Sequence, residues 1–118
     1  MTKATNPILK GAAVMLERKG RKEKAAIWKD ASEKLLDTSS HRVEVNLGHL
    51  SRNIVKATAV FVPGKVLGSG LLNRKLVVGA YSFSTSARKK IEEAGGQALE
   101  IQEFLKEYPK GSDVLLVE

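Results

Sequence analysis

The sequence of 118 residues predicts a mixed α/β domain with a basic, helical N-terminal extension. Three observations predict this class. Apolar residues recur at helical spacing over the first forty positions, short runs rich in valine and phenylalanine follow, and turn-forming residues separate these segments. A chain of this length can bury one hydrophobic core, so we expect a single domain over 1–118, with a basic helical part at 1–40 and a mixed α/β core at 41–118.

The N-terminal part is predicted to contain two helices. Asn6 and Pro7 suit the N-cap and the first position of a helix, whose apolar stripe continues as far as Gly20. A second helix is expected over 22–36, with Trp28 beside its apolar stripe. A tryptophan there can pack in the core or stack on a base, and we interpret Trp28 as a packing residue.

The mixed core is predicted to alternate short strands with helices, because runs of period two alternate with runs of helical period. The expected elements are a strand at 42–46, a short helix capped by Asn46 and extending through Ile54, strands at 57–62 and 75–83, a helix capped by residues 84–86 and ended by Gly95 and Gly96, a strand at 98–101, a helix through Phe104 and Leu105 to Pro109, and a strand at 113–117. Arg88, Lys89 and Lys90 are expected on the outer face of the helix that precedes Gly95.

The composition excludes several classes of protein. The chain has no cysteine, so it can form neither a disulfide framework nor a thiolate metal site, and it is compatible with a reducing compartment. Its longest apolar stretch is far shorter than a membrane span requires, and its start lacks the sustained apolar block of a signal peptide. We therefore expect a soluble, intracellular protein without a membrane partner.

No arrangement of residues predicts catalysis. His41 and His49 lie eight positions apart across an expected strand, with no neighbouring set of metal ligands. Ser69 lacks the flanking spacing of a nucleophile elbow, and Glu92 and Glu93 are adjacent on a helix, so their side chains diverge. We expect no enzyme activity, no metal, no cofactor and no small-molecule substrate.

Positive charge is concentrated in the first part of the chain. The total is +7, but residues 1–90 carry a net charge of +12 and residues 91–118 a net charge of −5. A surface this basic favours a polyanion such as nucleic acid. The densest cluster, at 18–24, is either a solvated connection between helices or an anion-binding surface. Together with Lys3, Lys10 and the lysine of the glycine-rich segment described next, it favours anion binding.

The segment 62–70, VPGKVLGSG, sets three glycines and a proline around Lys65 and Ser69. Glycine permits close approach of a backbone or a polyanion, and proline stiffens the chain, so this pattern predicts a shaped loop. A nucleotide P-loop is disfavoured because only three residues separate Gly64 from Gly68 and no Gly-Lys pair follows. Two alternatives remain, a phosphate-binding loop and a corner between strands that binds no ligand.

Several of these motifs together resemble the archaeal members of the ribosomal protein L-eighteen-e family. The resemblance is carried by EVNLG at 44–48, VPGKVLGSG at 62–70, and Phe83-Ser84 followed by Ala87, Lys90-Ile91 and Gly95, in an order that extends from Asn6-Pro7 to Gly111-Ser112. It implies a relationship to the bacterial ribosomal protein L-fifteen and an irregular β-β-α superhelical core. It further implies a structural component of the large (50S) ribosomal subunit, located in the cytoplasm, that binds large-subunit (23S) rRNA beside neighbouring ribosomal proteins.

The implied mechanism is neutralisation of closely packed phosphates by lysine and arginine, with backbone amides around residues 64–70 donating to phosphate or sugar oxygens. Because few aromatic residues are free to stack, recognition should depend on RNA shape. The expected RNA contacts are Lys3, Lys10, Arg18, Lys19, Arg21, Lys22 and Lys24 from the N-terminal part, and Arg42, Lys65, Ser69, Arg74 and Lys75 from the core. The alternatives are a stand-alone RNA- or DNA-binding regulatory protein and a protein-interaction module that uses the acidic C-terminal part.

Overall fold

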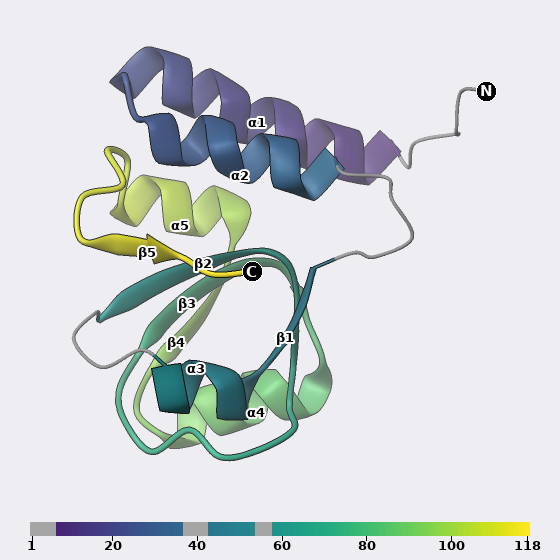
Figure 1. The fold of residues 1–118 in the computed structure, drawn as a ribbon, viewed down its shortest axis with the longest axis vertical. Coiled ribbons are helices and arrows are strands. Elements are labelled where there is room, and N and C mark those ends of the chain that lie inside the picture. Colours follow the sequence, from purple (N-terminus) through teal and green to yellow (C-terminus); the bar gives the residue numbers. More distant parts are fainter. Residues whose placement is uncertain (1–6, 37–42, 54–57) are drawn as a thin grey trace.

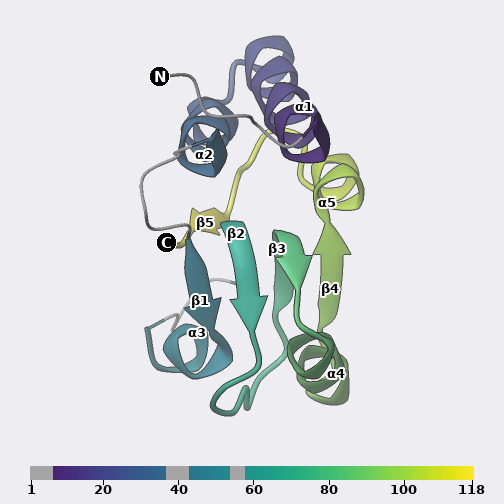
Figure 2. The same ribbon diagram turned by 90° about the vertical axis from the view of Figure 1, so that its right-hand side faces the viewer.

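The computed structural model describes residues 7–36, 43–53 and 58–118. Its elements are α1 (Pro7–Glu23), α2 (Ala26–Leu36), β1 (Glu44–Asn46), α3 (Leu47–Asn53), β2 (Ala59–Leu67), β3 (Val77–Phe83), α4 (Thr85–Glu93), β4 (Gln97–Glu100), α5 (Ile101–Glu107) and β5 (Val114–Leu116). Helices α1, α2 and α5 gather at one end of the molecule and α3 and α4 at the other, with the sheet between them (Figures 1 and 2).

The sheet is parallel and is built around β2. Strand β3 lies along one edge of β2, and β4 lies beyond β3. The other edge of β2 is shared, because β5 pairs with Ala59–Phe61 and β1 pairs with Lys65–Leu67. The register with β3 shifts between Val62 and Lys65, so Pro63 and Gly64 lie where β5 ends and β1 begins.

A segment without regular structure connects β2 to the parallel strand β3. Since Ala59 is in register with Val77, residues 68–76 must run back along the whole of β2, and nine extended residues span roughly the 30 Å that this requires. Leu72 and Leu76 of this return segment are buried. Helix α4 then carries the chain from the end of β3 to the start of β4. The β-β-α order confirms the predicted mixed α/β class with a helical N-terminal part.

Alternation along β2 divides the hydrophobic core into two clusters. Val60, Val62 and Val66 face the cluster formed with α3, α4 and the return segment. Ala59 and Phe61 face the cluster formed with α1, α2 and α5. This is the period of two expected of a strand buried on both faces.

Trp28 is the largest side chain of the second cluster and is fully buried. Its ring contacts Phe61 and Phe104 edge to face, with centroids 5.5 and 6.0 Å away. Its indole N–H donates to the carbonyl oxygen of Pro109 at 2.8 Å, which satisfies the one polar atom of the side chain. The interpretation of Trp28 as a packing residue is confirmed.

The boundary between the first two helices was predicted wrongly. Helix α1 continues past Gly20 to Glu23, and α2 begins at Ala26 instead of residue 22. Gly20 is buried, and a Cβ atom there would lie 3.0 Å from the carbonyl oxygen of Ala25 and 3.1 Å from the amide nitrogen of Lys29. Gly20 therefore lets α2 pack closely on α1, and the helix turn comes later, at Lys24 with φ of 56°.

The predicted strands shift by a few residues, with one larger error. Strand β2 does not end at Val62 but continues to Leu67, so six of the nine residues assigned to a glycine-rich loop belong to a strand. The reason is the register shift at Pro63 and Gly64, which lets the strand pass through both residues and pair with β1 afterwards. Strand β3 begins at Val77 and not at residue 75. Asn6, Ile54 and the start of the strand predicted at 42–46 lie outside the described residues.

The predicted caps of α4 are confirmed. The Ser84 hydroxyl accepts a hydrogen bond from the amide of Ala87 at 3.1 Å. Gly95 has φ of 85°, and the amide of Gly96 donates to the carbonyl oxygen of Ile91 at 3.0 Å. This is the helix end that a glycine in the left-handed region permits.

Candidate nucleic-acid interface

The turn at residues 68–70 is held by α3 and α4. The ammonium of Lys90 donates to the carbonyl oxygens of Gly68 and Gly70, at 2.7 and 3.1 Å. The amide of Gly48 donates to the carbonyl oxygen of Ser69 at 2.9 Å. The prediction that Lys90 lies on the outer face of its helix is wrong, because the half-buried side chain reaches back to satisfy these carbonyl groups.

The three glycines of the motif are explained by packing within the protein. A side chain at Gly64 would overlap the carbonyl oxygen of Val43, and one at Gly68 would overlap the Ser86 hydroxyl. Gly70 has φ of 89°, and a Cβ atom there would lie 2.6 Å from the Cα of Gly48. These positions need glycine whether or not a ligand is bound.

Two amides of the segment already have partners inside the protein. The amide of Lys65 donates to the carbonyl oxygen of Val43 at 3.0 Å, and that of Ser69 donates to the Asn46 side-chain oxygen at 3.3 Å. The expectation that amides around residues 64–70 bind phosphate is therefore wrong for these two groups. The side chains of Lys65 and Ser69 are exposed.

A basic surface forms where the return segment passes between α3 and α4. The Ser51 hydroxyl of α3 donates to the Asn73 side-chain oxygen at 3.1 Å, and the stem of Lys75 packs over Gly95 at the end of α4. These contacts place residues 73–75 between the two helices. We call this surface the α3–α4 face, and we assign to it Arg52 of α3, Ser69, Arg74 and Lys75 of the return segment and Lys89 of α4, of which Arg74 is half-buried and the others are exposed.

The chain carries no aspartate or glutamate between Glu44 and Glu92. This stretch contains all of α3, β2, β3 and the return segment, together with most of α4. Carboxylates border the face at its edges, because Glu92 and Glu93 follow Lys89 by three and four positions on α4 and Arg52 shares a hollow with Glu44 and Glu118. Over the stretch itself cations stand without carboxylates, and such a concentration of positive charge is typical of a surface that binds a polyanion.

The predicted core contacts do not all lie together. Ser69, Arg74 and Lys75 belong to the α3–α4 face, but Lys65 does not. Lys65 lines a hollow of about 280 Å³ on the other side of the sheet, whose wall includes Leu35 of α2 and Tyr81 of β3. Arg42 and Lys3 lie outside the described residues.

The basic cluster at 18–24 is divided between two sides of α1. Arg18, Lys19 and Lys22 line a hollow shared with α5, while Arg21 and Lys24 line another at the turn into α2. Lys10 is exposed nearer the start of α1. The predicted contacts of the N-terminal part therefore do not form one patch.

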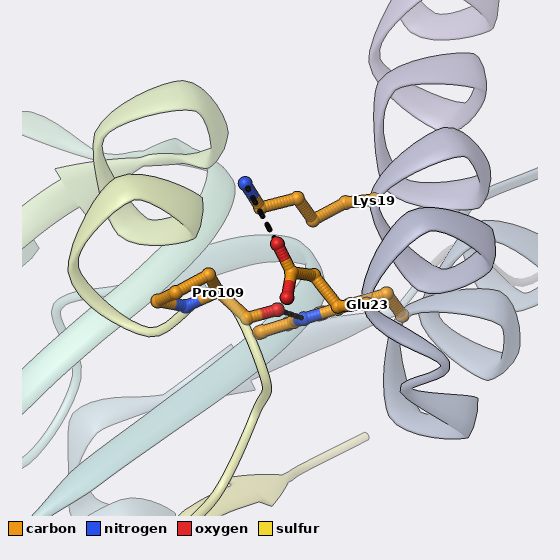
Figure 3. Close-up of polar contacts among 4 residues, drawn as sticks. Lys19, Glu23 and Pro109 are labelled. Atoms are coloured by element: carbon orange, nitrogen blue, oxygen red, sulfur yellow. Dashed lines mark hydrogen bonds and ion pairs between the residues drawn. The ribbon is translucent and has the colours of Figure 1, made fainter.

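Two cations of this cluster face carboxylates one helical turn away. The Lys19 ammonium lies 3.9 Å from a Glu23 carboxylate oxygen (Figure 3). The Arg21 guanidinium lies 3.5 Å from Glu17. These neighbours partly neutralise the cluster, so it is less basic than its sequence indicates.

Sequence reasoning missed four basic residues around α3 and α4. Arg52 and Lys89 contribute to the face, Lys90 holds the turn, and Arg88 lies over the Phe83 ring at 5.0 Å. The absence of acidic residues between positions 44 and 92 was the signal that could have found them.

Metal-ligating groups and apolar helices are two other features of the described part of the chain that bear on its class. Within it, no three histidine, cysteine, aspartate or glutamate side chains are grouped in a way that could hold a metal ion. Its helices also include none with the length and apolar character needed to cross a membrane. His49 is half-buried on α3, and His41 falls outside the described residues.

A parallel β-β-α core with a helical N-terminal part defines the class of this protein as a small mixed α/β domain. The chain belongs to the ribosomal protein family that comprises 50S-L15 and 50S-L18e together with a 60S member, and the profile of this family matches residues 24–99. The resemblance drawn from the sequence motifs is thereby confirmed.

Curated archaeal relatives match almost the entire chain. The protein named large ribosomal subunit protein eL18 of Methanoregula boonei is 39% identical over 113 residues, covering 96% of this chain and 93% of the relative. Proteins of the same name from Methanococcus maripaludis and Pyrobaculum aerophilum are each 40% identical and cover 97% and 98% of this chain, and 95% of each relative. The similarity thus includes both the helical N-terminal part and the core.

Proposed function

We propose that this protein is a structural constituent of the large ribosomal subunit that binds and stabilises folded large-subunit (23S) rRNA. Family membership and the names of the archaeal relatives support the ribosomal role. The observation that carries rRNA binding is the α3–α4 face, where cations from two helices and the return segment gather within a stretch free of acidic residues. The partners are then large-subunit rRNA and neighbouring ribosomal proteins, and the site of action is the ribosome.

The mechanism we propose is electrostatic and depends on RNA shape. Arg52, Arg74, Lys75 and Lys89 neutralise phosphates and release counterions, and the exposed Ser69 hydroxyl can bond to phosphate or sugar oxygens. Trp28, Phe61 and Phe104 are fully buried and Tyr81, Phe83 and Tyr108 are half-buried, so no aromatic ring is freely exposed for stacking on bases. Recognition through the RNA backbone therefore fits this surface better than recognition of base sequence.

A second set of proposed contacts lies at the other end of the molecule. Lys24 and Arg21 lie at the turn between α1 and α2, where Lys29 lines the same hollow. Lys10 and Lys65 are exposed at separate positions and extend the set. Lys3 and Arg42 remain proposed RNA contacts, and both lie outside the described residues. Because α1 and α2 lie at the opposite end from α3 and α4, these cations would reach a different segment of RNA (Figure 1).

The test is a comparison of affinities across a salt series. The intact chain is titrated with an archaeal large-subunit rRNA fragment and with a decoy RNA of equal length. The proposal predicts that the affinity for both RNAs falls steeply as salt rises, and that a preference for the ribosomal fragment persists at high salt. Equal affinity for both RNAs would contradict a specific role, and tight binding to a short sequence-defined site would favour the stand-alone regulatory alternative.

A further inference from the structure

The hollow between α1 and α5 differs in character from the α3–α4 face. The two helices lie side by side and pack against each other (Figure 2). Residues of both line a groove of about 490 Å³. Its lining includes the apolar side chains Val14, Met15 and Leu105 and the cations Arg18, Lys22 and Lys106. We call it the α1–α5 groove.

The apolar part of the groove does not suit RNA. No aromatic side chain lines it, so a base has no ring on which to stack. Contact between a phosphate and aliphatic carbon is not favourable. Met15 is 38% exposed although its side chain is apolar. A flexible methionine beside a leucine and a valine suits an aliphatic side chain supplied by a partner.

The charges around the groove point to an acidic partner. Arg18 and Lys22 border it from α1 and Lys106 borders it from α5, and no carboxylate is among its lining residues. Apolar contact surrounded by cations is complementary to an aliphatic anchor flanked by aspartate or glutamate.

Gly11 leaves room for such a partner to approach. It lines the groove, and no heavy atom lies within 4 Å of the position that its Cβ would occupy. Unlike the glycines of the 62–70 segment, Gly11 has no packing reason to lack a side chain. A glycine inside a helix lowers helix stability, so an open site at this position is consistent with a partner close to the backbone.

We propose that the α1–α5 groove docks a segment of a neighbouring large-subunit protein, one that places an aliphatic side chain between Val14, Met15 and Leu105 and carboxylates against Arg18, Lys22 and Lys106. This inference rests on the proposed ribosomal function, because it takes the partner from the same particle. It assigns Arg18 and Lys22 of the N-terminal part and Lys106 of α5 to protein contact, with the α3–α4 face remaining the principal RNA surface.

The test places a photo-crosslinking amino acid at Gln102, which lines the groove, in protein assembled into archaeal large subunits. A second protein carries the same group at Lys75 on the α3–α4 face. We expect the Gln102 probe to form crosslinks to a protein segment with acidic residues around an aliphatic residue, and the Lys75 probe to form crosslinks to rRNA. Crosslinks from Gln102 to rRNA alone, to a second copy of this chain, to a segment without acidic residues, or to nothing would overturn the inference.

The two probes separate the two proposals. If the Lys75 probe reaches no rRNA, the proposed function fails. If it reaches rRNA while the Gln102 probe reaches no acidic segment, only the groove assignment fails.

A variant that fills the groove gives an independent measurement. Gly11→Leu introduces a side chain into open space without a positive φ, so the helix should accept it, which circular dichroism checks. We expect a tenfold or greater loss of the protein crosslink from Gln102 and an unchanged rRNA crosslink from Lys75. Gly11→Ala, a smaller addition at the same position, should retain most of the protein crosslink. An unchanged yield with Gly11→Leu would contradict docking in the groove.

Discussion

Lys90 of α4 places its ammonium 2.7 Å from the carbonyl oxygen of Gly68, and the same group lies 3.1 Å from that of Gly70. One side chain thus ties a helix to both glycines of the turn that follows β2. Because this turn forms the first part of the return segment, the position of Ser69 on the α3–α4 face depends on this contact.

Lys90→Met should loosen the turn while keeping the aliphatic stem. Hydrogen bonds to a charged group contribute up to about 3 kcal/mol, and partial exposure of Lys90 reduces this, so we expect a loss of about 1–2 kcal/mol in the free energy of unfolding. Urea denaturation measures it. Lys89→Met, at an exposed neighbouring position, is the control and should change stability by less than about 0.5 kcal/mol. Equal effects of the two variants would show that the Lys90 contact contributes nothing to stability.

Glycine to alanine changes should have opposite signs at two positions. Gly70→Ala adds a Cβ atom to a residue with φ of 89° and presses it against Gly48, so we expect the free energy of unfolding to fall by about 1–3 kcal/mol. Gly11→Ala meets open space within a helix and should stabilise the protein by up to about 1 kcal/mol. Thermal unfolding of both variants tests the pair. A stable Gly70→Ala variant would refute the packing explanation of the motif.

Trp28→Ala should be among the most destabilising single changes. It empties the space between Phe61 and Phe104 and leaves the carbonyl oxygen of Pro109 without its indole donor. We expect a loss of about 3–5 kcal/mol. Equilibrium denaturation measures this loss. Trp28→Phe keeps part of the ring volume and should cost clearly less, and a loss under about 1 kcal/mol for Trp28→Ala would contradict the central position of this ring.

The sequence predicted elements with a strong local signal. Ser84 and Gly95 marked the ends of α4 correctly, because caps depend on a few adjacent residues. Gly20 was wrongly predicted to end a helix. Glycine is needed there because α2 packs closely against it, and a local sequence pattern does not reveal that contact. Gly64 was assigned to a loop for the same reason, since only the fold brings the backbone of Val43 against it.

The candidate site was predicted only in part, because the fold and not the local sequence decides which cations lie together. Net charge identified a basic protein, but it could not separate Lys65 from Lys75, which the parallel pairing of β2 and β3 puts on different sides of the sheet. Net charge also could not show that the Lys90 ammonium already donates hydrogen bonds to carbonyl oxygens of its own chain.

Lys65→Ala should weaken RNA binding without unfolding the domain, because its side chain is exposed and only its amide pairs within the fold. Loss of one phosphate contact should lower the slope of log affinity against log salt by about 1. Fluorescence anisotropy with the rRNA fragment measures both quantities. Unchanged affinity together with an unchanged slope would remove Lys65 from the interface.

The central claim is that the α3–α4 face binds rRNA, and the most direct measurement compares two double variants of equal charge. Lys75→Ala with Lys89→Ala removes two exposed lysines from the face, whereas Lys106→Ala with Lys110→Ala removes two exposed lysines from elsewhere. With the rRNA fragment in a salt series, we predict weaker binding and a slope lower by about 2 for the first pair, and near wild-type values for the second. Equal losses for both pairs would show that total charge, and not this face, determines binding.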